Sequence, residues 1–194
     1  MDWLDYNLSV ALELKLRFVC EQRPALEAAA GLLFKTLARN GRILICGNGG
    51  SASDSCHFAG ELVGRFLTDR QPFSAYSLAS DPATLTAIAN DFGYEEVFAR
   101  QVLAHGRPQD VLVAISTSGR SPNVVKAAEA ASSIDMKVVA LVGRLECPLA
   151  HASNIVLAAD NREGTSVNSA RIQEVHIFAI HSLCELIDRF DGDT

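Results

Sequence analysis

The stretch Arg42-Ile-Leu-Ile-Cys-Gly-Asn-Gly-Gly-Ser51 decides which fold this chain can adopt. Its first half is a short apolar run, which is typical of a strand buried on both faces. Its second half is rich in glycine, and a helical pattern follows to about Phe66. A buried strand that turns tightly into a helix is the first part of a βαβ unit. The stretch therefore predicts a parallel sheet covered by helices.

The same alternation continues along the rest of the chain, as segments of strand and helix pattern in turn. Further strands are expected over residues 74–78, 110–116, 137–142 and 154–158. Helices or helical turns are expected over residues 81–89, 94–104, 122–132 and 169–189. The pattern predicts an α/β fold in one domain over residues 1–194, a three-layer sandwich with a five-stranded parallel sheet.

The first forty residues predict a pair of helices before the sheet. The first covers about residues 4–20, and Pro24 is well placed as the first residue of the second. Asn40-Gly41 is a good signal for the end of that second helix. The pair is not needed to complete a βαβ sheet. It can pack on another subunit or cover a sheet face of its own subunit.

Composition and charge exclude several classes of protein. With 17 Lys and Arg against 23 Asp and Glu, the net charge of −6 argues against a general nucleic-acid or membrane-surface binder. Asp2 and Asp5 stand where a signal peptide would be basic, and no apolar run approaches the roughly 20 residues of a membrane span. The five cysteines lack a C-x-x-C pair and fit a reduced compartment, so we expect a cytoplasmic protein.

Ligands of open parallel sheets bind beyond the carboxyl ends of the strands, and the first loop there is Gly47–Ser51. Its glycines let the backbone approach a ligand, and free amides at the helix start favour an anion. With Ala52 the loop matches the dinucleotide motif G-x-G-x-x-A. The acid that this motif needs is missing, because Asp69 precedes the next predicted strand and Asp81 comes late. A tight turn without a ligand is the alternative.

The second loop, Ser116-Thr-Ser-Gly-Arg-Ser121, follows the strongest predicted strand. It places four hydroxyl groups and a glycine at a helix start, with Pro122 in the first turn. Hydroxyls and free amides together form a phosphate cradle, whereas one serine would be an ordinary N-cap. The sequence G-K-[ST] is absent, so the loop is not a nucleotide P-loop, and a sugar phosphate fits better than ATP.

Two short polar patterns are candidates for chemistry near these loops. His57 and Glu61 lie four residues apart on the predicted helix after the first loop, so they share a face. Such a pair can bind one metal ion, act as an acid–base pair, or be an ordinary surface pair. Asn90-Asp91 before Phe92-Gly93 fits a turn or the recognition of a sugar hydroxyl.

The last predicted helix carries Gln173, Glu174, His176 and His181 among apolar residues. Polar side chains are costly to bury without partners. At about 100° per residue, Glu174 and His181 are about 20° apart, and Gln173 and His181 about 80°. Spacing alone favours Glu174 as the companion of His181 and leaves open which residue faces a site. A hydrogen-bonded core or interface role is the alternative for either histidine.

Four stretches resemble the SIS-domain phosphoheptose isomerases, a family of sugar isomerases. They cover residues 46–66, 87–102, 109–127 and 171–188, in the family's order and over most of the chain. The segment Ile115-Ser-Thr-Ser-Gly119 alone would indicate only the wider sugar-phosphate-binding superfamily. The resemblance implies a flavodoxin-like fold and a homotetramer with active sites at subunit contacts. It would place the predicted helical pair, residues 1–40, in the oligomer interface.

The resemblance also implies an activity and its residues. The family converts D-sedoheptulose 7-phosphate to D-glycero-D-manno-heptose 7-phosphate, the first step of heptose synthesis for lipopolysaccharide or other glycoconjugates. Glu61 and His181 are its acid–base positions. His57, Glu61, Gln173 and His181 are its positions for one zinc ion per subunit, which overrules the spacing preference for Glu174. The implied substrate-binding positions are Asn48, Gly49, Gly50, Ser51, Glu61, Asn90, Asp91, Ser116, Thr117, Ser118, Ser121 and Gln173.

Aldose–ketose isomerisation needs a base near two adjacent carbons, an acid or electrophile near their oxygens, and an anchor for the phosphate. Our hypothesis is that Glu61 moves the carbon proton and His181 serves the oxygens. Two other classes remain open: a sugar-phosphate-binding adaptor, such as the SIS protein that binds a replication initiator, and a nicotinamide-dependent oxidoreductase. The four positions of the implied zinc set favour the enzyme, because an adaptor has no chemical use for all of them.

Overall fold

A parallel five-stranded sheet forms the centre of the protein, with strand order β2-β1-β3-β4-β5. The computed structural model describes residues 2–160 and 167–192. The strands are β1 (Ile43–Gly47), β2 (Ala75–Ser77), β3 (Val111–Ser116), β4 (Lys137–Val142) and β5 (Ile155–Ala158). Each lies within one residue of its predicted ends, so the predicted α/β class and parallel sheet are confirmed.

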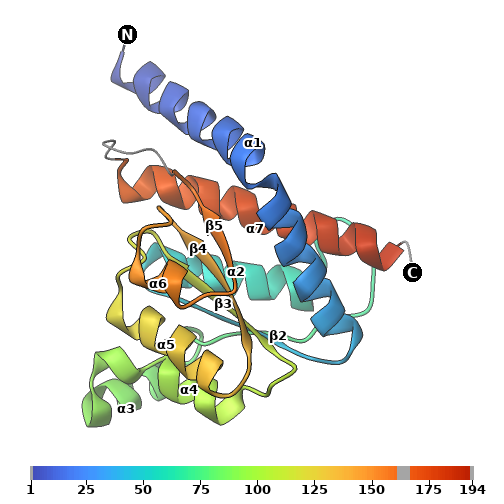
Figure 1. Ribbon diagram of the computed structural model, residues 1–194, viewed down its shortest axis with the longest axis vertical. Helices are drawn as coiled ribbons and strands as arrows, with labels where there is room; N and C mark the ends of the chain where they lie inside the picture. The colour runs from blue at the N-terminus through green and yellow to red at the C-terminus, as the bar shows by residue number, and fades with distance from the viewer. Residues whose placement is uncertain (1, 161–166, 193–194) are drawn as a thin grey trace.

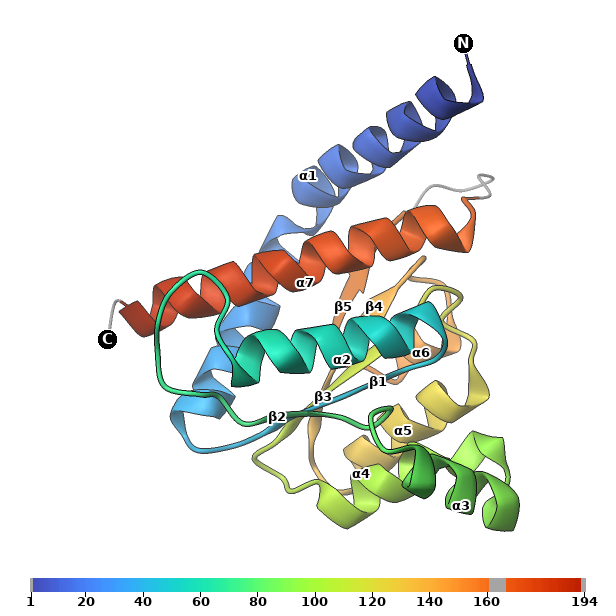
Figure 2. The same cartoon turned by 180° about the vertical axis from the view of Figure 1, so that it is seen from behind.

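Helices cover both faces of this sheet, which gives the predicted three layers (Figures 1 and 2). One face is covered by α1 (Trp3–Ala38), α2 (Gly50–Val63) and α7 (Ser169–Gly192). The other is covered by α4 (Ala99–His105), α5 (Pro122–Ser133) and the short α6 (Pro148–His151), which sequence analysis did not predict. Helix α3 (Pro82–Phe92) packs on the short 3₁₀ turn η1 (Tyr94–Glu96), and η1 packs on α5.

The two faces hold separate cores because successive residues of a strand point to opposite sides. Ile43 and Ile45 of β1 pack with α1, α2 and α7. Leu44 and Cys46 of the same strand pack with α4 and α5. Burial on both sides explains why β1 reads as a continuous apolar run rather than an alternating one.

The predicted break at Pro24 is wrong, because residues Trp3–Ala38 form one helix with Pro24 inside it. Proline removes one helical hydrogen bond, and its ring crowds the carbonyl four residues earlier. Phe18 before the proline and Leu26 after it belong to the same core, and α1 packs on α7 and β5. Packing therefore keeps the helix continuous where local sequence predicts a boundary.

Of the two alternatives for the N-terminal segment, packing on the chain's own sheet is confirmed for the second half of α1, and packing on another subunit stays a prediction. The second half of α1 covers the sheet of its own chain through Ala29, Ala30 and Leu33. Its first half extends beyond the sheet (Figure 1). Among the described residues, no helix is both long enough and apolar enough to cross a membrane. All five cysteines are free thiols.

Candidate active site

The strand order places both predicted ligand loops together. β1 and β3 are neighbours at the centre of the sheet, and the chain leaves them toward opposite faces, into α2 and α5. The crevice at such a switch point is where open α/β sheets bind ligands. The first loop (Gly47–Ser51) follows β1, and the second loop (Ser116–Ser121) follows β3. Their adjacency supports a ligand role over two unrelated turns.

Two glycines of the first loop are in special positions. Gly49 has a φ of 56°, in the left-handed region that side chains rarely adopt. Gly50 begins α2, and a Cβ there would collide with the side-chain amide of Gln173. The first loop thus lies directly against α7, which carries Gln173.

Asn48 joins the first loop to the first turn of α5 through paired amides. Its Nδ2 donates to Asn123 Oδ1 at 2.8 Å, and Asn123 Nδ2 donates back to Asn48 Oδ1 at 2.8 Å. The Tyr94 hydroxyl donates to the same Asn48 oxygen at 3.1 Å. Sequence analysis missed Asn123 and Tyr94. The available signal was a polar residue directly after Pro122, in the first turn of a helix that was predicted to start at the phosphate loop.

The second loop gathers three serine hydroxyls around one glycine. Ser116 Oγ lies 3.2 Å from Ser121 Oγ and 3.5 Å from Ser118 Oγ. Gly119, with a φ of 63°, donates its amide to Ser116 Oγ at 3.1 Å. Thr117 is fixed from behind, since its carbonyl accepts from the Gly143 amide at 3.1 Å. The structure thus clusters these hydroxyls at the start of α5, and their predicted role as a cradle for an anion stays a prediction.

The predicted acid–base residues meet between α2 and α7. His57 Nε2 lies 2.9 Å from His181 Nε2, although the two residues are 124 positions apart in the chain. Glu61 Oε1 lies 3.4 Å from His57 Nε2. The side chains of His57 and Glu61 are 43% and 23% exposed, so the group is open to a small molecule. The Phe66 ring packs against His181 with a centroid distance of 5.5 Å.

Gln173 and Glu174 have different partners. Gln173 Nε2 donates to Asp54 Oδ1 at 3.1 Å and lies against Gly50 of the first loop. Glu174 instead pairs with Arg171 at 2.8 Å. The structure therefore places Gln173 at the site, whereas spacing alone had favoured Glu174. His176 is buried and hydrogen-bonds the Val142 carbonyl, which is the core role left open for it.

Asp54 is a site residue that sequence analysis missed. It lies on α2, one turn before His57, and is buried with one carboxylate oxygen unpaired. Burial raises the pKa of Asp54, while the Gln173 hydrogen bond and nearby His57 act in the opposite direction. The three-residue step from Asp54 to His57 was the available signal, since it puts both on one face of α2.

Asn90 and Asp91 stand apart from the cluster of α2 and α7. They lie near the end of α3, across the sheet from those helices (Figures 1 and 2). Both are exposed, and Asn90 Nδ2 donates to Asp91 Oδ1 at 2.8 Å. Their predicted contact with a sugar hydroxyl stays a prediction.

The donor types at the α2–α7 cluster suit zinc, since imidazole nitrogen and carboxylate oxygen are its common ligands. The present arrangement is a hydrogen-bonded one. In the part of the chain that the structure describes, no group of three or more His, Cys, Asp or Glu side chains is arranged to hold a metal ion.

Comparison with known proteins agrees with this geometry. The SIS domain family matches residues 6–143. The phosphoheptose isomerase of Helicobacter pylori strain P12 is 52% identical over 164 residues, which are 84% of this chain and 83% of that protein. The phosphoheptose isomerase of Bordetella avium is 48% identical over 187 residues, 91% of each chain.

Solved structures show the same likeness over nearly the whole length. The phosphoheptose isomerase of Neisseria gonorrhoeae superposes with a TM-score of 0.87 at 39% identity, covering 96% of this chain and 97% of its own. That of Francisella tularensis superposes with a TM-score of 0.89 at 36% identity, covering 97% and 100%. The chain belongs to the SIS-domain family and, within it, to the phosphoheptose isomerases.

Proposed function

We propose that this enzyme converts D-sedoheptulose 7-phosphate to D-glycero-D-manno-heptose 7-phosphate, by proton transfer through a cis-enediol. Two observations carry the proposal: Glu61, His57 and His181 meet between α2 and α7, and the hydroxyl groups of the second loop cluster at the switch point where α5 begins. The related phosphoheptose isomerases support the choice of substrate. This reaction would supply heptose phosphate for the synthesis of glycoconjugates such as lipopolysaccharide.

The site divides the work between an anchor and an acid–base pair. Hydroxyls and amides of the second loop would hold the phosphate, which fixes the reacting carbons without taking part in the chemistry. Glu61 would remove the proton from one carbon and return it to its neighbour. His181 would exchange protons with the two oxygens and help to open the sugar ring. Asn48, with Gly49, Gly50 and Ser51, would contact the sugar hydroxyls.

We also propose one zinc ion per subunit, held by His57, Glu61, Gln173 and His181. When bound, zinc would polarise the substrate carbonyl and stabilise negative charge on its oxygen. The donor chemistry supports this set. Gln173 would exchange its hydrogen bond to Asp54 for this role, since its amide lies beside the first loop.

Proton NMR of the protein with sedoheptulose 7-phosphate tests the function. New aldose anomeric signals are expected, and parallel samples with a chelator and with zinc restored test the need for metal. No new signals from folded, zinc-supplied protein would overturn the proposed reaction. Broadened substrate signals in that case would indicate a sugar-phosphate-binding adaptor.

Replacing the base tests the assignment of Glu61. The variant Glu61→Gln removes the proton acceptor and is expected to abolish turnover while leaving the far-ultraviolet circular dichroism unchanged. The matched control is Glu174→Gln on α7, which removes the carboxylate that spacing alone favoured. It pairs with Arg171 in the structure, so turnover should stay within about twofold of the parent. A Glu61→Gln variant with a near-normal rate would overturn the assignment.

We further propose a cytoplasmic homotetramer that uses the first half of α1 as an interface. Leu4, Leu8, Leu12 and Leu16 on this half are each more than half exposed, which is unusual for a monomer. The five free cysteines are compatible with a reduced compartment.

A further inference from the structure

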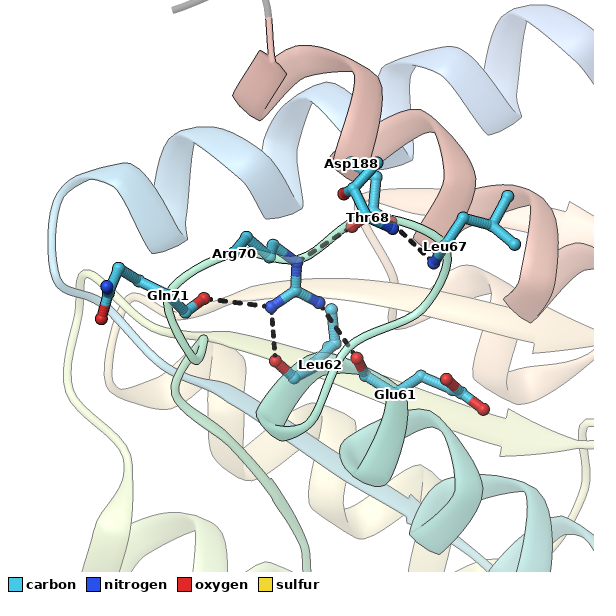
Figure 3. Close-up of polar contacts among 7 residues, drawn as sticks. All are labelled: Glu61, Leu62, Leu67, Thr68, Arg70, Gln71 and Asp188. Carbon is cyan, nitrogen blue, oxygen red and sulfur yellow. Dashed lines mark hydrogen bonds and ion pairs between the residues drawn. The ribbon is translucent and has the colours of Figure 1, made fainter.

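A buried ion pair lies beyond the site residues, between the segment after α2 and the end of α7. Arg70 Nε donates to Asp188 Oδ1 at 2.9 Å, and both side chains are only 3% exposed. The amides of Leu67 and Thr68 donate to the other Asp188 oxygen at 3.0 and 3.1 Å (Figure 3). Burial acts to raise the pKa of Asp188, but these hydrogen bonds outweigh it and the pKa is lowered. The carboxylate is therefore charged and fully partnered at neutral pH.

The remaining nitrogens of Arg70 bind the last turn of α2. Nη2 donates to the Glu61 carbonyl at 3.0 Å, and Nη1 donates to the Leu62 carbonyl at 2.9 Å. Carbonyls in the last turn of a helix lack partners within the helix, so Arg70 satisfies two of them. The Glu61 side chain extends away from the guanidinium (Figure 3). One side chain thus joins the backbone of Glu61 to α7.

The ion pair and the acid–base residues share one face of α7. Asp188 follows His181 by seven residues, which places them within about 20° of each other around the helix. The same two helices meet at His57 and His181, whose Nε2 atoms lie 2.9 Å apart. α2 is therefore attached to α7 on both sides of the Glu61 carboxylate, once through its backbone and once through His57.

We propose that Arg70 and Asp188 are positioning residues, whose ion pair sets the placement of Glu61 relative to His181. The inference rests on the proposed function, because it assigns Glu61 and His181 to proton transfer. Proton transfer depends steeply on distance, and a displacement of about 1 Å can cost about 100-fold in rate. Arg70 suits this task because its planar fork can bind a carboxylate and two carbonyls at once, which a lysine ammonium does less well.

The test compares two carboxylate-to-amide variants that differ in place. Asp188→Asn weakens the proposed positioning pair. The control, Asp110→Asn, weakens an ion pair with Arg42 in which Asp110 is 1% exposed. Asp110 also accepts from the backbone amides of Arg42 and Arg107 at 2.8 and 3.0 Å. Asp110 directly precedes β3, at the amino ends of the strands, whereas the two loops lie at the carboxyl ends. It therefore matches Asp188 in chemistry and burial but lies away from the site.

Asp188→Asn is expected to lower kcat for sedoheptulose 7-phosphate by at least about tenfold. KM should stay within about twofold, because the second loop on β3 and α5 is untouched. Asp110→Asn should keep kcat within about twofold of the parent, even if its melting temperature falls as far as that of Asp188→Asn. Unchanged kcat in Asp188→Asn, or equal losses in both variants, would overturn the inference. Arg70→Lys replaces Asp188→Asn if that variant does not fold, with the same expectation.

A second readout separates this inference from the proposed reaction. The ring signals of His57 and His181 are recorded by NMR at one fixed pH in the parent and both variants. Asp188→Asn should move them and Asp110→Asn should not, whether or not the parent turns over the sugar. If the parent protein does not turn over the sugar but the signals move only in Asp188→Asn, the proposed reaction is overturned and the positioning role is supported. Signals that stay unmoved in Asp188→Asn overturn the positioning role, even if the parent is active.

Discussion

Two glycines and one histidine show how single residues support the site from behind. A side chain at Gly50 would displace Gln173, and one at Gly119 would collide with the buried Cys147. The second collision adds to the strain of a left-handed backbone at Gly119. His176 supports the same region, since its Nε2 lies 3.1 Å from the carbonyl of Val142, next to the residue whose amide holds Thr117. Each of the three residues therefore supports the placement of neighbouring site residues through packing or a hydrogen bond.

His176 should make the stability of the protein depend on pH. Burial lowers its pKa from 6.5 to about 4, and the hydrogen bond with the Val142 carbonyl only partly opposes this. Between these two values the unfolded chain binds a proton that the folded chain does not, so stability falls as the pH falls from 6.5 toward 4. The expected loss is about 3 kcal/mol over this window.

The variant His176→Gln keeps a possible donor to Val142 and removes the titration. Its unfolding free energy, from urea denaturation at fixed protein concentration, should be lower than the parent's near pH 7. The gap between the two proteins should narrow by about 2–3 kcal/mol near pH 4.5. Parallel losses in both proteins would show that carboxylates, rather than His176, account for the acid sensitivity.

Sequence analysis found the residues whose spacing is local and missed those whose partners are distant. His57 and Glu61 were paired by their four-residue step on one helix, and the structure keeps that pair. Asp54 and Asn123 were missed because the hydrogen bonds that place them at the site come from Gln173 and Asn48, on other elements. Burial and partners of this kind are set by tertiary contacts, which periodicity does not report.

At the scale of elements, strands were predicted better than the first helix. Buried parallel strands are short apolar runs with clear ends, so the limits of all five were found within one residue. α1 was divided at Pro24 because proline is a strong local signal for a helix start. Long-range packing of Phe18 and Leu26 in one core outweighs the loss of one helical hydrogen bond there.

The first half of α1 should hold the proposed tetramer together. Leu8, Leu12 and Leu16 follow one another at four-residue steps along one side of the helix, with exposed fractions of 58%, 53% and 68%. Burying each leucine against another subunit would contribute about 1.5–3 kcal/mol. Leu12→Glu puts a charge in the middle of this stripe and is expected to remove the four-copy species.

Light scattering after size-exclusion chromatography checks this expectation. The control is Asn7→Glu, which adds the same charge to the same half-helix about 140° around it from Leu12, at a side chain that bonds the Trp3 carbonyl. It should stay tetrameric. A Leu12→Glu protein that also stays tetrameric would show that another surface joins the subunits.

At the scale of the whole molecule, the strand order brings the two loops together into one crevice. The order β2-β1-β3-β4-β5 puts the exits of β1 and β3 next to each other, while α2 and α5 lead away on opposite faces. A ligand at this point touches segments that are about 70 residues apart, as the Asn48–Asn123 pair already does at a separation of 75. Strand order is not written in any single motif, so sequence analysis could place a loop after each strand without establishing that the two loops meet.

Bridging of this kind predicts that substrate stabilises the fold even when it is not turned over. In the Glu61→Gln protein, sedoheptulose 7-phosphate at about 100 times its Kd should add about 2.7 kcal/mol, because it binds only the folded state. For a chain of this size that corresponds to a rise in Tm of roughly 5–10 °C.

Introducing Ser121→Ala into that protein should abolish most of the rise, since Ser121 Oγ belongs to the hydroxyl cluster of the second loop. Ser132→Ala is the control on the same helix, where the hydroxyl only bonds the Ala128 carbonyl, and it should leave the rise intact. Inorganic phosphate should bind the second loop without reaching the first and therefore bind more weakly, so it should give a smaller rise than the sugar phosphate at equal concentration. An equal rise with both would mean that the sugar makes no productive contact with the first loop, and that the switch point binds only an anion.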